Sequence, residues 1–206
     1  APPKVNDYES FTTAIRNSGL VGLGGAGFPT AVKLTMKDLS IIDTLIINGA
    51  ECEPYITADN REFIENPQDI IDGILAVKKW LGIKSVIIGI ERNKPEAIDT
   101  MFALSKGDPS ITVKPLPSVY PQGAEKVLIE NCTGREVPRG GLPSDVGCIV
   151  MNVSSVSFVA KYLRTGMPLV SRRLTVDGAV GEPRNLNVIV GTPIQNLLDF
   201  CGGLKG

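Results

Sequence analysis

The amino-acid sequence predicts an α/β domain with a mainly parallel sheet over residues 1–166 and a smaller second unit over residues 167–206. Apolar runs of strand length alternate with helical segments along the first part of the chain, which indicates this fold class. The runs are mainly apolar rather than alternating, as in parallel strands that are covered on both faces. After Gly166 the pattern changes to strands in which apolar and polar residues alternate.

Four runs predict the strands of the sheet, because each is short, continuous and apolar. They cover residues 41–48, 84–90, 110–116 and 148–153. Helices are predicted at residues 8–17, 29–36, 66–82, 93–107, 122–134 and 154–166. In the longest of these, lysines lie near the end and Gly82 follows as a stop signal. A loop rich in Pro and Gly is expected at residues 135–147.

The second unit reads as two strands and a helix. Residues 169–178 and 185–190 predict the strands, and residues 193–200 predict the helix. A β-β-α unit of this size is too small to hold a hydrophobic core alone. We therefore expect the start of a second domain that is cut short at Gly206.

The composition excludes several classes of function. The formal net charge is −1, so nothing indicates a nucleic acid or an anionic membrane surface as a partner. Histidine is absent, which removes His-based catalytic triads and His metal sites. The four cysteines have no CxxC spacing, so no metal or iron–sulfur site is expected within this chain. No apolar run approaches the roughly 20 residues of a membrane span.

The stretch SGLVGLGGAGFPTAVKLTMKD, residues 18–38, contains a GxGxxG pattern at Gly22, Gly24 and Gly27. A dinucleotide fingerprint requires a buried strand directly before the first glycine, and the preceding TAIRNSGLV is no such strand. An ordinary Rossmann dehydrogenase is therefore disfavoured. Two interpretations stay open: a simple glycine-rich turn, or a loop whose amides and following helix hold a phosphate, with Lys33 in reach.

Polar residues also follow the predicted strands. Asn48, Glu51 and Glu53 come directly after the first strand, and Asn152 lies at the end of the fourth. The YPQGAEK segment, residues 120–126, enters a helix after the third strand. In α/β folds ligands bind at the carboxyl ends of the strands. These features suit a planar ligand with a phosphate tail.

Four motifs in order resemble one known family: GLGGAGFPTAVKL, NGAECEPYITADNR, YPQGAEK, and GREVPRGGLP with a following MNV. They are similar to the RnfC subunit of the Rnf electron transport complex and, more distantly, to the NADH-oxidising flavoprotein subunit of respiratory complex I. The tail resembles the opening of a soluble-ligand-binding β-grasp (SLBB) domain. The resemblance implies a Rossmann-like three-layer FMN-binding domain at residues 1–166 and a partial SLBB domain at residues 167–206.

The resemblance also implies a function. Members bind FMN non-covalently, take hydride from NADH and pass electrons to 4Fe–4S clusters, which are expected only in a C-terminal region missing from this chain. The expected enzyme is an ion-pumping NADH:ferredoxin oxidoreductase at the cytoplasmic face of the membrane. RnfC is held there by partner subunits and is linked indirectly to ferredoxin, and the fragment itself is expected to be soluble.

Site residues follow from the resemblance position by position. Glu51 and Glu53 match acids beside the isoalloxazine and the nicotinamide and are the expected catalytic residues. Phe28 matches an aromatic that stacks on adenine, and Asn152 matches an asparagine at the FMN phosphate. The expected cofactor-binding residues are Gly22, Gly24, Gly25, Phe28, Lys33, Asn48, Tyr120, Gly123, Glu125 and Asn152.

Four residues depart from the complex I pattern. Met36 replaces a second adenine-stacking aromatic, Ala124 a glutamate, Met151 an asparagine and Cys52 a serine. These changes concern the nicotinamide side more than the FMN side. Alternative functions remain: an RnfC-like electron carrier to a soluble reductase, a cobalamin reductase, or a non-catalytic docking module with a degenerate flavin site.

Overall fold

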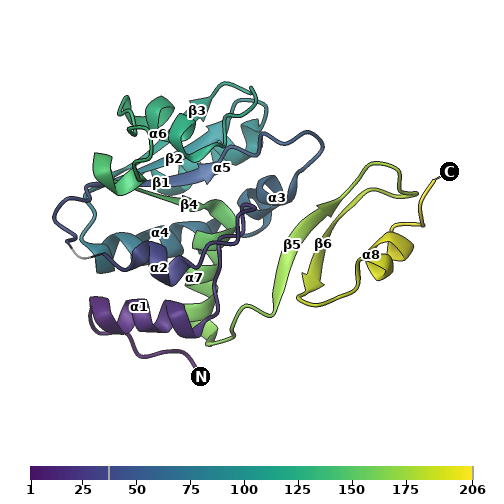
Figure 1. Ribbon diagram of the computed structural model, residues 1–206, viewed down its shortest axis with the longest axis horizontal. Coiled ribbons are helices and arrows are strands. Elements are labelled where there is room, and N and C mark those ends of the chain that lie inside the picture. The colour runs from purple at the N-terminus through teal and green to yellow at the C-terminus, as the bar shows by residue number, and fades with distance from the viewer. Residues whose placement is uncertain (37, 206) are drawn as a thin grey trace.

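The computed structural model describes residues 1–36 and 38–205 (Figure 1). Its centre is a parallel four-stranded sheet in the order β3-β2-β1-β4. The strands are β1 (Thr44–Gly49), β2 (Ser85–Glu91), β3 (Ile111–Leu116) and β4 (Cys148–Asn152). Successive β1 residues Leu45, Ile46 and Ile47 are all fully buried, because helices cover both faces. This explains why the runs are mainly apolar, and it confirms the predicted α/β class.

Helices form a layer on each side of the sheet (Figure 1). Ile47 faces the larger layer, which holds α4 (Pro67–Leu81), α5 (Pro95–Ser105) and α7 (Val153–Thr165), with α1 (Tyr8–Asn17) and α2 (Thr30–Leu34) outside them. Ile46 faces the other side, where α6 (Glu125–Thr133) packs through Leu128 and Ile129. The three-layer prediction is therefore confirmed.

The strand order creates a switch point between β1 and β4. From β1 the chain moves outward to β2 and β3, and then returns across the sheet through α6 to place β4 on the other side of β1. Asn48 at the end of β1 lies in register with Asn152 at the end of β4. In sheets of this kind a crevice opens where the strand order reverses, just beyond the strand ends.

Several predicted boundaries were wrong. Helix α3 (Ala58–Glu65) was not among the predicted helices, because its buried face is only Glu62 and Phe63, too little to give an apolar pattern. The strand predicted from residue 41 begins at Thr44. The backbone of the preceding Asp43 bonds to Gly147 and Ser85 at the edge of the ladder, and its carboxylate binds the Arg135 guanidinium. Helix α6 begins at Glu125 rather than residue 122, because turns occupy the residues before it.

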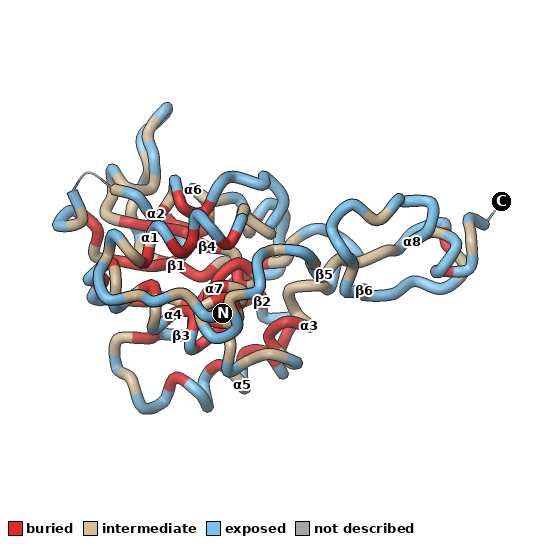
Figure 2. The backbone as a smooth tube through the Cα atoms, turned by 90° about the horizontal axis from the view of Figure 1, so that it is seen from below, coloured by how far each residue is buried: buried red, intermediate tan, exposed pale blue. Residues whose placement is uncertain are grey.

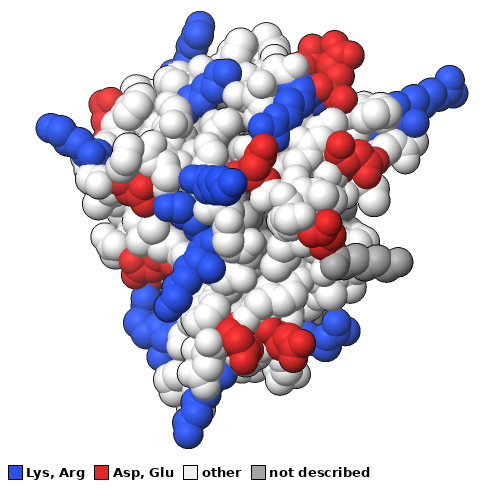
Figure 3. All heavy atoms as spheres, turned by 90° about the vertical axis from the view of Figure 1, so that its left-hand side faces the viewer, with Lys and Arg blue, Asp and Glu red and all other residues white. Residues whose placement is uncertain are grey.

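Other differences are smaller. Helix α2 ends at Leu34, where residues up to 36 were expected to be helical. The loop predicted at residues 135–147 contains the short 3₁₀ turn η1 (Pro143–Val146). The four cysteines are free thiols. Basic and acidic side chains are interspersed on the face drawn in Figure 3, in keeping with the net charge of −1.

The second unit is an antiparallel hairpin followed by a helix, as the sequence predicted. It consists of β5 (Ser171–Val176), β6 (Arg184–Ile189) and α8 (Ile194–Phe200). Figure 2 shows it as mainly exposed beside the buried interior of the larger domain. Among its described residues only Val180 and Cys201 are buried. The division of the chain at residue 166 stays a prediction, although α7 ends next to it, at Thr165.

Candidate functional site

Two adjoining cavities lie at the switch point, and they gather all twelve predicted site residues. The larger, about 460 Å³, is lined by Gly24, Gly25, Asn48, Glu51, Glu53, Tyr120, Gly123 and Asn152 among others. The smaller, about 160 Å³, adds Gly22, Phe28, Lys33 and Glu125. Gly24, Gly25, Asn48 and Asn152 line both. Residues that are far apart in the sequence therefore surround one crevice.

The glycine loop lies across the end of β4. A hydrogen bond joins the two ends of the loop: the amide of Gly22 donates to the Phe28 carbonyl at 2.8 Å. The amide of Leu23 donates to Ser155 Oγ at 2.9 Å and so ties the loop to α7. A Cβ on Gly24 would lie 3.1 Å from the Asn152 side chain. The loop can approach β4 this closely because it has no side chain at that position.

Asn48 joins the end of β1 to the 120–124 segment. Its Nδ2 donates to the Gly123 carbonyl at 2.9 Å, and its Oδ1 accepts from the Ala50 amide at 3.1 Å. A Cβ on Gly123 would lie 2.5 Å from the Ala50 carbonyl oxygen, so this position requires glycine. The Gly123 amide donates to Cys52 Sγ at 3.3 Å. The cysteine that replaces a serine in the complex I pattern thus accepts a hydrogen bond in the cavity wall.

Asn152 organises the opposite wall. Its Oδ1 accepts from the amides of Ser154 at 2.9 Å and Ser155 at 3.3 Å, which caps the N-terminus of α7. Its Nδ2 donates to Asp59 Oδ2 at 2.6 Å, and Ser154 Oγ donates to Asp59 Oδ1 at 2.6 Å. Asp59 thereby fixes the orientation of Asn152 from the neighbouring helix α3.

Asp59 is a site residue that the sequence analysis missed. It lines the larger cavity, and burial of its carboxyl group raises its pKa to about 6, against the lowering effect of the hydrogen bonds from Ser154 and Asn152. The nearby Glu51 carboxylate acts in the same direction as burial. Asp59 does belong to a motif that the sequence analysis singled out, NGAECEPYITADNR, whose last residues form the first turn of the unpredicted helix α3.

The two expected catalytic acids have different environments. Glu51 accepts from the amides of Asp59 at 2.8 Å and Asn60 at 3.1 Å, so its carboxylate binds the N-terminus of α3. Glu53 is exposed, and within residues 1–36 and 38–205 it makes no ion pair. Glu53 is therefore the acid whose carboxylate remains available to a ligand in the cavity.

Lys33 and Glu125 meet in the smaller cavity. Lys33 Nζ donates to Glu125 Oε1 and to the Val150 carbonyl, both at 2.9 Å. The side chains are 33% and 41% exposed, so water still reaches the pair. This contact connects α2, α6 and β4 around the cavity.

The aromatic residues lie at the cavity edges. Phe28 is 49% exposed and Tyr120 68% exposed, which leaves their rings open to a ligand. Met36, at the position of the second stacking aromatic, packs against the hydrophobic core and lines neither cavity. Ala124 lines the larger cavity and Met151 the smaller.

The second unit also contributes to the site, which the sequence analysis did not foresee. Arg172, Arg173, Leu174 and Thr175 of β5 line the larger cavity. Nothing in the alternating pattern of β5 indicated that it would lie against the glycine loop, because such a pattern gives no information on distant packing.

Comparisons with known proteins identify the family and the fold. The family model described as "Nuo51 FMN-binding domain" matches residues 15–161, and the model for the SLBB domain matches residues 173–206. The chain belongs to the Nuo51 FMN-binding domain family. The resemblance to RnfC is confirmed as well, because curated relatives with the name of that component match nearly the whole chain.

Two relatives are the C subunits of ferredoxin:NAD(+) oxidoreductase complexes. The one from the proton-translocating complex of Clostridium ljungdahlii is 46% identical over 93% of this chain and 42% of its own length. The one from the Na(+)-translocating complex of Acetobacterium woodii is 41% identical over 97% of this chain and 45% of its own length. The chain thus spans less than half the length of these relatives.

A solved structure shares the fold. The NAD+-reducing [NiFe]-hydrogenase in its H2-reduced state matches with a TM-score of 0.79 over 96% of this chain and 40% of the hydrogenase chain, at 21% identity. The air-oxidised state gives the same TM-score at 22% identity. Among the described residues, no helix has the length and apolar character to cross a bilayer.

Proposed function

We propose that this chain is the flavin- and nicotinamide-binding part of an RnfC-type subunit of an ion-translocating oxidoreductase. Bound FMN would accept a hydride from NADH and release electrons to iron–sulfur clusters located outside this chain. The proposal is supported most directly by the convergence of all twelve predicted residues on two adjoining cavities at the switch point. Partner subunits, a membrane-bound complex and ferredoxin as the distant partner belong to the same proposal.

The cavity walls fit a flat ligand with a phosphate tail. The larger cavity lies within the range of about 300–1,000 Å³ that small-ligand sites occupy. Gly24 and Gly123 leave the space that side chains would fill, at the Asn152 side chain and the Ala50 carbonyl respectively. The amides of Gly24 to Gly27 bind no protein acceptor among the described residues, so they are available to an anion.

Each residue then has a defined task. The glycine loop would bring its backbone close to the cofactor. Asn48 ties the end of β1 to the 120–124 segment, and Asn152 ties the end of β4 to α3. Glu53 would supply a negative charge to a ligand in the larger cavity, and the exposed ring of Phe28 would offer a face to a base. Hydride transfer belongs to the cofactor, and the protein contributes binding, orientation and charge. A chain without histidine can support this chemistry.

Binding of FMN to the purified chain, followed by flavin fluorescence, tests the proposal. We expect saturable binding, and bleaching of the bound flavin when NADH is added without oxygen. Gly24→Val should abolish binding, because the new side chain would crowd Asn152. Gly107→Val is the matched control, since a Cβ there meets open space. Saturable binding without bleaching would limit the function to flavin, and no binding by the folded wild type would contradict it.

A further inference from the structure

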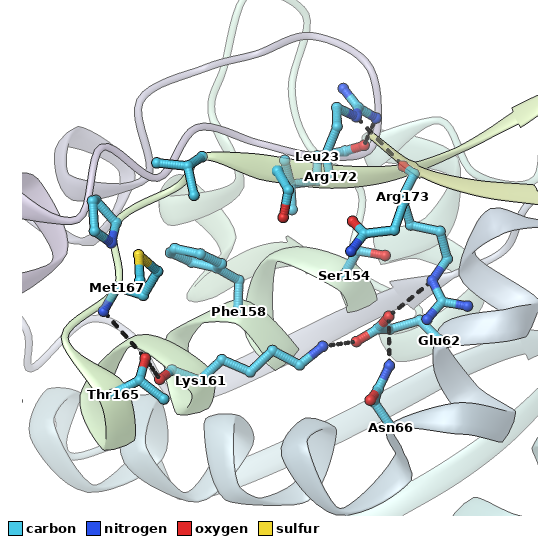
Figure 4. A pocket seen from close by; sticks show the side chains of 14 residues that line it. Leu23, Glu62, Asn66, Ser154, Phe158, Lys161, Thr165, Met167, Arg172 and Arg173 are labelled. Atoms are coloured by element: carbon cyan, nitrogen blue, oxygen red, sulfur yellow. Dashed lines mark hydrogen bonds and ion pairs between the residues drawn. The ribbon is translucent and has the colours of Figure 1, made fainter. Parts of the chain in front are cut away.

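We propose that Arg172 of the second unit binds a phosphate group of the nucleotide that occupies the crevice, an inference that rests on the proposed function. The first support is position. Arg172 lines the larger cavity together with Gly24, Gly25 and Asn152. It also lines a neighbouring cavity of about 390 Å³ between α7 and β5, drawn in Figure 4.

The second unit is fixed to both loops of the site. Arg172 Nη2 donates to the Leu23 carbonyl at 3.0 Å, directly before Gly24 (Figure 4). On the other side of the cavity, the Thr57 amide donates to Thr175 Oγ1 at 3.1 Å, and Asn185 Nδ2 donates to Thr57 Oγ1 at 2.8 Å. These contacts hold β5 as one wall of the crevice.

The charge of Arg172 is not neutralised, whereas that of its neighbour is. Arg173 pairs with Glu62 at 3.4 Å and with Glu65, and Figure 4 shows Glu62 also bound by Lys161. In the part of the chain that the structure describes, no carboxylate lies within 4 Å of the Arg172 guanidinium. Its two hydrogen bonds go to carbonyls, at Leu23 and, at 3.5 Å, at Arg173.

A guanidinium with this arrangement is suited to a phosphate. Arg172 Nη1 has no acceptor among the described residues, and the side chain is exposed, so it can turn toward a ligand. The amides of Gly24 and Gly25 stand unbound beside it. Arginine binds phosphate oxygens through charge-assisted, often bidentate hydrogen bonds, and neighbouring amides complete such a site.

The test compares FMN with riboflavin, which lacks the phosphate. Dissociation constants are measured by flavin fluorescence for the wild type, Arg172→Ala and Arg172→Lys. We expect Arg172→Ala to weaken FMN binding about tenfold or more and to leave riboflavin binding unchanged, with partial recovery in Arg172→Lys. Arg184→Ala is the control, because Arg184 lies on the same hairpin, pairs with Glu182 and lines neither cavity.

The phosphate can belong to FMN or to NADH, and a second titration distinguishes the two. If FMN binding is unchanged, NADH is titrated into the FMN-loaded proteins, and a weaker NADH dissociation constant for Arg172→Ala assigns the contact to the pyrophosphate. Unchanged affinity for both nucleotides, or an equal loss of riboflavin binding, would overturn the inference while leaving the proposed function intact. Failure of the wild type to bind either flavin would overturn both.

Discussion

Asp59 shows how a single side chain couples the walls of the site. Its carboxylate accepts hydrogen bonds from Asn152 and Ser154, and so it links α3 to the start of α7. Burial makes this carboxyl group harder to ionise and raises its pKa to about 6. Asp59 therefore makes the free energy of unfolding depend on pH.

The Asp59→Asn variant should reveal this pH dependence. Between the ordinary pKa of 3.8 and about 6, the folded protein holds a proton that the unfolded chain has released. The free energy of unfolding therefore falls as pH rises through this window, by up to about 3 kcal/mol. Asparagine cannot ionise, so the variant should lose less stability than the wild type between about pH 4.5 and pH 7. Urea denaturation at several pH values measures this difference.

Asp72→Asn is a suitable control for that experiment, because Asp72 lies exposed on α4. The free energy of unfolding of Asp72→Asn should depend on pH as that of the wild type does. An Asp59→Asn profile parallel to that of the wild type would show that Asp59 ionises at its ordinary pKa in the folded protein.

At the scale of elements, α3 connects the loop after β1 with the rest of the site. Its first turn has no side-chain cap from Thr57, and the carboxylate of Glu51 binds the amides of Asp59 and Asn60 instead. A negative charge at this end also interacts favourably with the helix dipole. Glu51 thus has a structural task that Glu53, two residues later, does not share.

The pair Glu51→Ala and Glu53→Ala separates these roles. We expect Glu51→Ala to lower the free energy of unfolding by about 1 kcal/mol, as loss of a helix cap does. Glu53→Ala should stay within about 0.5 kcal/mol of the wild type, because its side chain is exposed. Chemical denaturation at neutral pH gives both values. Equal losses in the two variants would refute the capping role of Glu51.

At the scale of the whole molecule, the second unit packs on the first through charged groups. Glu62 is nearly buried and is bound by Lys161 at 2.7 Å, by Ser157 Oγ at 2.5 Å and by Arg173. Arg173 is the member of this cluster that comes from β5. It therefore connects the hairpin to α3, whereas the second unit itself has few buried apolar residues.

Arg173→Ala should loosen the hairpin without unfolding the larger domain. Loss of its charged hydrogen bonds should lower the free energy of local opening of the hairpin by about 1.5–3 kcal/mol. We expect faster amide hydrogen exchange in residues 171–189 and unchanged exchange in β1 and β2. Arg184→Ala should leave the hairpin unchanged, because its partner Glu182 lies in the same unit. Uniformly faster exchange across both units would contradict a local role.

Much of the fold and the site could be predicted from local patterns. The apolar runs identified all four parallel strands, and the four motifs supplied the twelve residues that line the cavities. Helix α3 was missed because its single buried apolar residue, Phe63, gives no periodic signal. Asp59 was missed because its importance depends on a contact with Asn152, 93 positions away in the sequence.

The sequence by itself determined the class of fold, the four strands of the sheet along the chain and the family to which the chain belongs, because these depend on apolar periodicity and on motifs read along the chain. Only the tertiary structure decided which partner each polar group has. It placed the Glu51 carboxylate at the N-terminus of α3, joined Asp59 to Asn152 and brought β5 against the glycine loop. These contacts join residues up to 149 positions apart, and local propensity carries no information at such separations.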